Sequence, residues 1–420
     1  MSTPSSSQPP SRGEPAPGRS TQRGSPASSI RNSPAARDAE LIGTPPRRLP
    51  AAATITAGEI ALVCARYDIG EITRVQRLKR GSGSSPKVIL QTSTGEYILK
   101  RLAPTRADPR RVAFSHELQL FLISRGFPAP PLIGTRDGNN SMLQTRGNTY
   151  ELHRYIRGRE DSRLPDDART AGAALSVLHR TLQEFGLHTD AGWTPPASSY
   201  HNSDHVPRAL ARIPRRFDDP DRREVALNLI DLYRRSAVEA GATEPEWKPA
   251  PFIHGDWHPG NMLFLSRANR RAPATAEAGD GAAVACVLDF DSARPGQRII
   301  DVANGALQFA LARPAEDATS GSLRTAPATR SKQKQAVSEL SYERYRAFID
   351  GYHFNVGTAL SAGERRAIPW LMIQALIAEA AIPIAITGRF GKVDPMGVLR
   401  LVRRKAGWIE QHAGEFHIGG

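Results

Sequence analysis

The chain has few cysteines: its 420 residues include only Cys64 and Cys286, which lie far apart and form no C-x-x-C pair. This scarcity argues against a framework of disulfide bonds and against a zinc knuckle, and it is typical of proteins in a reducing compartment. We therefore expect a cytoplasmic protein.

The chain also lacks a long uninterrupted hydrophobic run. Its N-terminus has no apolar segment of the kind found in secretory signals, and the most apolar stretch, residues 371–386, contains Gln374, Glu379 and Pro383. Such a stretch is too short and too interrupted to span a bilayer. We expect it to form a buried helix of a soluble protein.

Acidic residues are in the minority, with 42 Asp and Glu against 56 Lys and Arg and a formal net charge of +14. Positive charge of this size favours an anionic partner such as a nucleotide, a nucleic acid or a membrane surface. The sequence contains neither the aromatic motifs of RNA-binding sheets nor a recognisable helix-turn-helix. A nucleic-acid or membrane partner is therefore not clearly indicated.

The composition and periodicity of the chain change at two places. Residues 1–52 are rich in Ser, Pro, Gly and Arg and predict a disordered tail. The following region, 53–156, predicts a small antiparallel sheet with one inserted helix at 109–125. Its remaining predicted elements are a helix at 55–69 and strands at 71–78, 87–92, 96–102, 131–135, 141–145 and 149–158.

The last region, 157–420, is predicted to be mainly helical. A pair of strands is expected where residues 252–264 meet residues 283–291, and two polar insertions, 266–282 and 313–334, are expected to be loops. The predicted helices are 168–182, 223–240, 296–312, 338–357, 363–386 and 395–413.

Four polar residues of this region have a spacing suited to phosphoryl transfer. His254, Asp256 and Asn261 fit the pattern H-x-D-x-x-x-x-N, and Asp289 ends an apolar strand further along the chain. Transfer from ATP needs a carboxylate that orients the attacking hydroxyl and accepts its proton, and hard oxygen ligands for Mg²⁺. Asp256 is suited to the first task, and Asn261 and Asp289 to the second.

A cation is also needed to hold the nucleotide phosphates. Lys100 ends the predicted third strand in Y-I-L-K, a form of the V-A-I-K pattern of kinases. Glu117 is the only acidic residue in the following helix, so we expect it to pair with Lys100. The order of these residues along the chain is the order that a kinase requires.

These residues resemble the aminoglycoside phosphotransferase and choline-kinase-like family of the protein-kinase-like fold. H-G-D-W-H-P-G-N (254–261) is similar to that family's catalytic loop, and residues 287–303 resemble its I-D-F…D-x-A segment. The resemblance covers about residues 70–310. It implies an α+β fold of two lobes, an N-lobe (53–156) with a hinge near 150–156 and a larger helical C-lobe (157–420).

The resemblance also implies roles for individual residues. Asp256 would be the catalytic aspartate, Asn261 and Asp289 the magnesium ligands, and Lys100 the phosphate anchor with Glu117 as its partner. The remaining implied roles are a structural His254, His258 near the transferred phosphate, Asp301 supporting the catalytic loop, and the backbone of Glu151, Leu152 and His153 facing the adenine.

Two features leave alternatives open. The chain has no G-x-G-x-x-G motif but only R-G-S-G-S-S (80–85), so the amides of Ser82, Gly83 and Ser84 are weaker candidates for phosphate contacts. His254 and His258 are four residues apart like the zinc ligands of H-E-x-x-H, but Pro259 disfavours the helix that such a pair requires.

The expected function is phosphorylation of a small-molecule hydroxyl with ATP and Mg²⁺. Residues 361–405 contain three acidic residues against eight Lys or Arg, which disfavours a polycationic aminoglycoside. A sugar, an amino alcohol or a homoserine-like metabolite fits better. The alternatives are an atypical protein Ser/Thr kinase, disfavoured by the absence of an A-P-E motif, and a non-catalytic pseudokinase.

Overall fold

The computed structural model describes residues 54–78, 85–188, 193–265, 284–311, 340–354, 357, 359–391 and 393–417. The predicted tail (1–52), the residues Ser82, Gly83 and Ser84, and the insertions at 266–282 and 313–334 lie outside the described residues.

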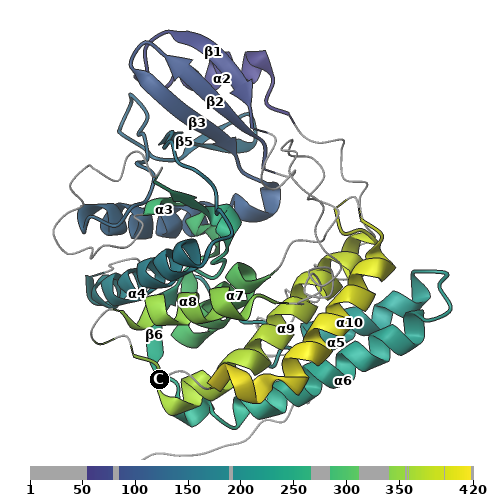
Figure 1. Cartoon of the computed structure of the whole chain (residues 1–420). Helices are drawn as coiled ribbons and strands as arrows, with labels where there is room; N and C mark the ends of the chain where they lie inside the picture. Colours follow the sequence, from purple (N-terminus) through teal and green to yellow (C-terminus); the bar gives the residue numbers. More distant parts are fainter. Residues whose placement is uncertain are drawn as a thin grey trace, which may run out of the picture. The chain divides into compact units, whose positions relative to one another are not determined.

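A five-stranded antiparallel sheet forms one end of the described structure, at the top of Figure 1. Its strand order is β1-β2-β3-β5-β4. The stretch predicted as a strand at 131–135 contributes only a bridge from Leu132 to His153, because its first residue, Pro131, and the preceding Pro130 have no N–H to donate. The strands are β1 (Ile72–Arg77), β2 (Lys87–Thr92), β3 (Gly95–Arg101), β4 (Leu143–Thr145) and β5 (Asn148–Arg154).

Helix α2 (Ala57–Cys64) packs against this sheet. It begins with a capping box in which the Thr56 hydroxyl accepts a hydrogen bond from the Glu59 N–H and the Glu59 carboxylate accepts one from the Thr56 N–H. The helix is shorter than the predicted 55–69. Tyr67 and Ile69, which follow it, are still buried in the same apolar cluster, and this explains why the apolar spacing continues past the helix end.

Helix α3 (Pro109–Ser124) confirms the helix predicted at 109–125. The Asp108 carboxylate accepts hydrogen bonds from the N–H groups of Arg110 and Arg111, and Pro109 occupies the first helical position, where no N–H is needed. The chain reverses after the helix at Gly126, whose φ of 77° favours glycine.

The second half of the structure is mainly helical and lies below the sheet in Figure 1. It confirms the predicted α+β arrangement of a small sheet-containing lobe and a larger helical lobe. Helix α5 was not predicted from the sequence. The helices are α4 (Pro165–His188), α5 (His205–Arg212), α6 (Arg222–Gly241), α7 (Arg298–Ala310), α8 (Tyr342–His353), α9 (Ala362–Thr387) and α10 (Pro395–Gln411).

Two short strand pairs are formed by four strands that lie between α6 and α7 along the chain. β7 (Met262–Phe264) pairs with β8 (Val284–Val287), which confirms part of the predicted pairing of 252–264 with 283–291. The first part of that stretch, β6 (Pro249–Ile253), pairs instead with β9 (Arg294–Gln297). The two pairs therefore hold both ends of the segment 254–261.

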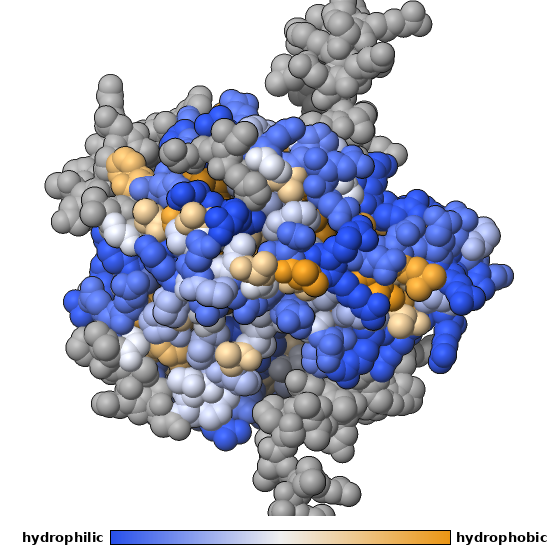
Figure 2. Space-filling model, turned by 90° about the horizontal axis from the view of Figure 1, so that it is seen from below, coloured by the Kyte–Doolittle hydropathy of each residue, from blue (hydrophilic) through white to orange (hydrophobic). Residues whose placement is uncertain are grey.

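Helix α9 has the length and hydropathy of a helix that could cross a membrane, but 67% of its most apolar window is buried inside the fold. It packs against α6, α7 and α10, so its apolar composition is explained by the core. The face in Figure 2 is mostly hydrophilic, with small separate hydrophobic areas. The exposed large hydrophobic residues of the described chain come from different elements, such as Leu120 in α3 and Leu227 in α6.

Candidate active site

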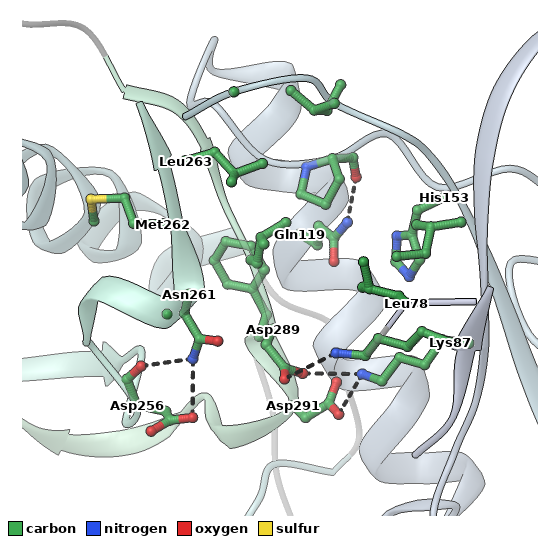
Figure 3. Close-up of a pocket in the computed structure, with 18 of the residues that line it drawn as sticks. Leu78, Lys87, Gln119, His153, Asp256, Asn261, Met262, Leu263, Asp289 and Asp291 are labelled. Carbon is green, nitrogen blue, oxygen red and sulfur yellow. Dashed lines mark hydrogen bonds and ion pairs between the residues drawn. The ribbon is translucent and has the colours of Figure 1, made fainter. Parts of the chain in front are cut away.

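Asp256 and Asn261 lie side by side on the segment that joins β6 to β7 (Figure 3). The Asn261 Nδ2 donates hydrogen bonds to the backbone oxygen and to the Oδ2 of Asp256, both at 3.0 Å. Because Nδ2 is used in this way, the Oδ1 of Asn261 is on the other side of the amide group, toward Asp289 in Figure 3. The structure therefore brings these predicted site residues together.

Asp301, in the first turn of α7, forms hydrogen bonds to the segment that joins β6 to β7. Its carboxylate accepts hydrogen bonds from the His254 N–H at 2.6 Å and the Gly255 N–H at 2.8 Å, and lies 3.3 Å from the Nε2 of His179. Burial alone would raise the pKa of Asp301, but the hydrogen bonds and the two histidines hold it below its usual value. The predicted supporting position of Asp301 is confirmed.

His254 is fully buried and its two ring nitrogens have different partners. Nε2 lies 3.1 Å from the Leu288 backbone oxygen, which can only accept, and Nδ1 lies 3.3 Å from the Asp256 N–H, which can only donate. The proton is thus on Nε2. Burial lowers the pKa of His254, so the ring is a neutral structural link between the segments that carry Asp256 and Asp289.

Gly255 has a φ of 77°, in the left-handed region that favours glycine. A side chain at this position would also meet the guanidinium group of Arg294 and the backbone oxygen of Ser292. Both reasons require glycine immediately before Asp256. The turn that aims Asp256 into the site therefore depends on it.

Lys100 does not pair with Glu117 as predicted. Its Nζ lies 3.6 Å from the Glu151 carboxylate, 3.0 Å from Asp289 and 2.7 Å from Asp291. Glu151 is directly opposite Lys100 in the register of β3 and β5, and directly opposite residues point to the same face of a sheet. Sheet pairing therefore places this partner next to Lys100. Burial opposes the charge of Lys100, but the three carboxylates raise its pKa.

Two histidines hold Glu151 in place. The Nε2 of His116, in α3, lies 3.0 Å from the Glu151 Oε1, and the Nε2 of His153 lies 3.5 Å from Oε2. Burial alone would raise the pKa of Glu151, but Lys100 and the histidines keep it well below its usual value. Helix α3 therefore reaches Lys100 through His116 and Glu151 rather than through Glu117.

Asp289 and Asp291 lie next to lysine side chains of the sheet (Figure 3). The Nζ of Lys87, in β2, lies 3.9 Å from the Asp289 Oδ2, and the guanidinium of Arg106 lies 3.6 Å from Asp291. Burial raises the pKa of Asp289, but Lys100 and Lys87 more than offset this and hold it well below its usual value. Asp289 is therefore ionised at neutral pH.

Asp289 also has an unusual backbone conformation. Its φ of 64° and ψ of 62° are left-handed, just before the short 3-10 helix of residues Phe290–Ser292. The left-handed conformation raises the free energy of a non-glycine residue by roughly 1–2 kcal/mol. Residues in such conformations concentrate at functional sites. The conformation turns the Asp289 carboxylate toward Lys100.

His258 lies beside Asp256. Its Nδ1 accepts a hydrogen bond from the Gly260 N–H at 2.9 Å, so in the neutral ring the proton is on Nε2, which lies 3.7 Å from the Asp256 Oδ2. Burial would lower the pKa of His258, but Asp256 raises it above its usual value. For Asp256, burial is likewise outweighed by His258, His254 and Asn261, which lower its pKa.

A cavity of about 740 Å³ lies between the sheet and these residues. This volume is in the range of cofactor and ligand sites. The cavity is lined by the sheet residues Lys87, Ile98 and Lys100, by residues of the segment 256–263, and by 288–291.

The backbone of Glu151, Leu152 and His153, which was predicted to face the adenine, is engaged in pairing with neighbouring backbone. Glu151 and His153 pair with β3, and the Leu152 oxygen accepts a hydrogen bond from the Ile133 N–H. One side of this backbone is thus occupied by β3 and the other by the segment that contains Ile133. The N–H and C=O of Ile156, which lines the cavity just beyond β5, form no hydrogen bond within the described part of the chain.

The donor set of the site fits Mg²⁺. Asn261 Oδ1 and the Asp289 carboxylate would supply the hard oxygen ligands that Mg²⁺ prefers, and the two side chains are neighbours in Figure 3. Asp291, which makes the shortest ion pair to Lys100, is a less accessible ligand because its side chain is 12% exposed, against 23% for Asp289.

Comparison with known proteins agrees with this geometry. A family model described as the phosphotransferase enzyme family matches residues 75–329, more than half of the chain. A homoserine kinase of Phenylobacterium zucineum is 25% identical over 218 residues, which are 50% of this chain and 60% of that protein. The match therefore spans less than two thirds of the length of this relative.

Solved structures share the fold. A microcompartment-associated aminopropanol kinase superposes with a TM-score of 0.56 at 15% identity, covering 86% of this chain and 98% of that chain. An amicoumacin kinase in complex with AMP-PNP and Ca²⁺ gives a TM-score of 0.56 at 11% identity, with 83% and 92% covered. An aminoglycoside phosphotransferase from Alicyclobacillus acidocaldarius gives 0.53 at 16%, with 84% and 93% covered. These similarities show the protein-kinase-like fold.

Proposed function

Because the chain belongs to the phosphotransferase enzyme family, we propose that it transfers the terminal phosphoryl group of ATP to a hydroxyl group of a small molecule. The observation that carries the proposal is the position of the Asp256 carboxylate. Asn261 and the loop supported by Asp301 fix it at one edge of a cavity, and Asp289 and Lys100 lie opposite.

Asp256 would orient the acceptor hydroxyl and take its proton as the new P–O bond forms. Its pKa is below the usual value, so it is ionised at neutral pH and is a weak base. A weak base suffices for a loose phosphoryl-transfer transition state, in which positioning and charge stabilisation matter more than early proton removal. His258, whose Nε2 is 3.7 Å from the Asp256 Oδ2, would contact the transferred group.

The other residues would bind the nucleotide. Asn261 and Asp289 would hold Mg²⁺, which when bound neutralises charge on the phosphates. Lys100, kept protonated by Glu151 and its other carboxylate neighbours, would bind phosphate oxygens. The N–H and C=O of Ile156, which form no hydrogen bond within the described ranges, would provide a donor and an acceptor for the edge of the base.

The acceptor that fits best is a small amino alcohol. Of the three acidic residues in 361–405, Glu364 is buried in an ion pair with Arg298 and Asp394 caps α10. Glu379, on α9, is exposed and accepts a hydrogen bond from Gln308 at 2.6 Å. Desolvation by the surrounding protein atoms and the negative charge of Asp256 raise the pKa of Glu379. Among the acidic residues described in 361–405, Glu379 is thus the one whose charge interacts with that of Asp256, and one such carboxylate suits one ammonium group better than a polycation.

The relatives are compatible with this class of acceptor. The curated relative with 25% identity is a homoserine kinase, and homoserine carries one hydroxyl and one ammonium group. We therefore include homoserine-like amino acids among the proposed acceptors, with neutral sugars as the less favoured class.

A screen of acceptors tests the proposal. The purified protein is incubated with ATP, Mg²⁺ and single acceptors from a panel of amino alcohols, homoserine, neutral sugars and aminoglycosides, and ADP formation and product mass are measured. We expect ADP and a phosphorylated product with an amino alcohol or homoserine. A panel in which no acceptor raises ADP formation above that of the Asp256→Ala variant would refute the proposal.

A further inference from the structure

Lys87, Lys100 and Glu151 form one row across three neighbouring strands. Lys87 is directly opposite Lys100 in the register of β2 and β3, and Lys100 is directly opposite Glu151 in that of β3 and β5. Directly opposite residues point to the same face of the sheet, so both ammonium groups lie on the cavity side, as Figure 3 shows for Lys87.

Two like charges in this arrangement are unfavourable by themselves. Directly opposite like charges destabilise a sheet, and a lysine is rarely buried without a partner. The Lys87 side chain is only 18% exposed, and its one carboxylate within 4.0 Å among the described residues is Asp289. Because two neighbouring, mostly buried lysines lower stability, we look for a function that requires both charges.

Asp289 is an incomplete partner for Lys87. The Nζ of Lys87 lies 3.9 Å from the Asp289 Oδ2, too far for a hydrogen bond, whereas Lys100 lies 3.0 Å from Oδ1. Within the described part of the chain the Lys87 ammonium donates no hydrogen bond, although it has three N–H donors. These donors line the cavity and are available to an anion there.

We propose that Lys87 is a second cationic ligand of the nucleotide phosphates, acting beside Lys100. The inference rests on the proposed function, since it takes the cavity to hold a nucleoside triphosphate. If Asp289 turned to a metal ion, Lys87 would lose the one carboxylate that lies within 4.0 Å of it among the described residues, and phosphate oxygens would take that place. In this arrangement Lys87 positions the phosphates, while Asp256 remains the catalytic residue.

The competing explanation is that Lys87 only balances the charge of Asp289. The two explanations differ in how the effect of removing Lys87 depends on the ligand. A phosphate ligand contributes to binding of ATP and inorganic tripolyphosphate but not of adenosine. A counter-ion of Asp289 affects metal binding and leaves metal-free binding of tripolyphosphate unchanged.

The experiment compares Lys87→Met, Lys87→Arg and the control Lys248→Met with the unmodified protein. Lys248 precedes β6, and its ammonium group donates a hydrogen bond to the backbone oxygen of Ala359 at the surface. Lys248→Met therefore removes one positive charge, as Lys87→Met does, but leaves the site unchanged. Dissociation constants for adenosine, ATP and tripolyphosphate are measured by calorimetry, with EDTA and with Mg²⁺, and melting temperatures show that each variant is folded.

We expect Lys87→Met to weaken binding of ATP and tripolyphosphate about 10-fold or more, as for loss of a charged hydrogen bond, and binding of adenosine by less than about twofold. Lys87→Arg should restore most of the phosphate affinity. Equal weakening for adenosine and ATP, or an unchanged affinity for tripolyphosphate, would overturn the inference. If Lys87→Met does not fold, Lys87→Gln replaces it under the same criteria.

The outcome also separates this inference from the proposed function. An unmodified protein that binds ATP but phosphorylates no acceptor refutes the proposed function and leaves the role of Lys87 supported by the binding data. An unmodified protein that binds neither ATP nor tripolyphosphate overturns both.

Discussion

Asp301 and Gly255 are joined by a hydrogen bond of 2.8 Å from the Gly255 N–H to the Asp301 Oδ1. The bond connects the first turn of α7 to the residue immediately before the proposed catalytic aspartate. A buried carboxylate with several donors is a rigid support, because every alternative position of the loop leaves its charge without partners. The position of Asp256 is therefore set by the helical lobe.

Asp301→Ala should destabilise the protein. The variant leaves the backbone N–H groups of His254 and Gly255 buried without an acceptor, and loss of such a buried charged partner costs about 3–5 kcal/mol. We expect a decrease of this size in the free energy of unfolding measured with urea. The control is Asp350→Ala, in an exposed pair with Arg169, which should change it by less than about 0.5 kcal/mol. Similar decreases in both variants would contradict the supporting role.

Asp256→Ala should slow the reaction without affecting nucleotide binding. The residue would act on the acceptor hydroxyl, and loss of a proton acceptor typically lowers kcat by about 10²–10⁴-fold. We expect such a loss with the best acceptor of the panel, and an ATP dissociation constant within about twofold of the unmodified value. Asp231→Ala, on the exposed side of α6, is the control. A kcat equal to that of the control would contradict the assignment.

Contacts between residues close together in the sequence were predicted correctly, whereas contacts made by strand pairing were not. Asp256 and Asn261 belong to one loop, so their spacing in the sequence already constrains their geometry, and they were predicted together. The partner of Lys100 was predicted wrongly as Glu117, since the true neighbour Glu151 depends on the pairing of β3 with β5. The partner of Lys100 is therefore set by the register of the sheet and not by the position of an acidic residue in the next helix.

Other omissions have the same physical origin. Lys87 was overlooked because its importance comes from being opposite Lys100 across the β2–β3 hairpin. Counting back from the turn at residues 93–94 would have paired the two lysines, since an antiparallel hairpin fixes its register at the turn. The occupied backbone of Leu152 depends on Ile133, in a segment that pairs too little to be recognised from its sequence.

Glu59 should contribute stability that is lost in acid. Its carboxylate accepts hydrogen bonds from the Thr56 N–H and the Tyr150 hydroxyl and pairs with Arg101. Burial alone would raise its pKa, but these bonds lower it from 4.5 to about 2. A carboxyl group with a depressed folded pKa stabilises fully above its unfolded pKa and loses this contribution as pH falls through the folded pKa.

The test compares unfolding of the unmodified protein and Glu59→Gln between about pH 5 and pH 2, the range set by this shift. The free energy of unfolding of the unmodified protein should fall more steeply over this range, because all other carboxyl groups are common to both proteins. Parallel curves would show that Glu59 gains no such stabilisation from its partners.

Glu379→Gln should raise the KM of an amino-alcohol acceptor. If Glu379 binds the ammonium group, its loss removes a charged interaction, which corresponds to about a 10-fold higher KM, while kcat changes less. A neutral polyol acceptor should show no such increase. Glu410→Gln, in a surface pair with Arg235, serves as the control. An equal rise in KM for charged and neutral acceptors would contradict the assignment.

Asp289 allows the metal ligand and the backbone strain to be tested separately. Asp289→Ala and Asp289→Gly both remove the carboxylate, so both should weaken binding of ATP in the presence of Mg²⁺ far more than in its absence. Only glycine adopts the φ of 64° without strain. We therefore expect the glycine variant to exceed the alanine variant in free energy of unfolding by about 1 kcal/mol.

The measurements are ATP titrations with Mg²⁺ or EDTA and urea unfolding of both variants. Because the two substitutions share the loss of charge beside Lys100 and Lys87, the difference in stability between them reports the backbone alone. Unchanged dependence of ATP binding on Mg²⁺ would refute Asp289 as a metal ligand. Equal stability of the two variants would show that the backbone at residue 289 leaves the left-handed conformation at little cost once the carboxylate is removed. The ion pairs of Asp289 with the two lysines would then be what maintains that conformation in the unmodified protein.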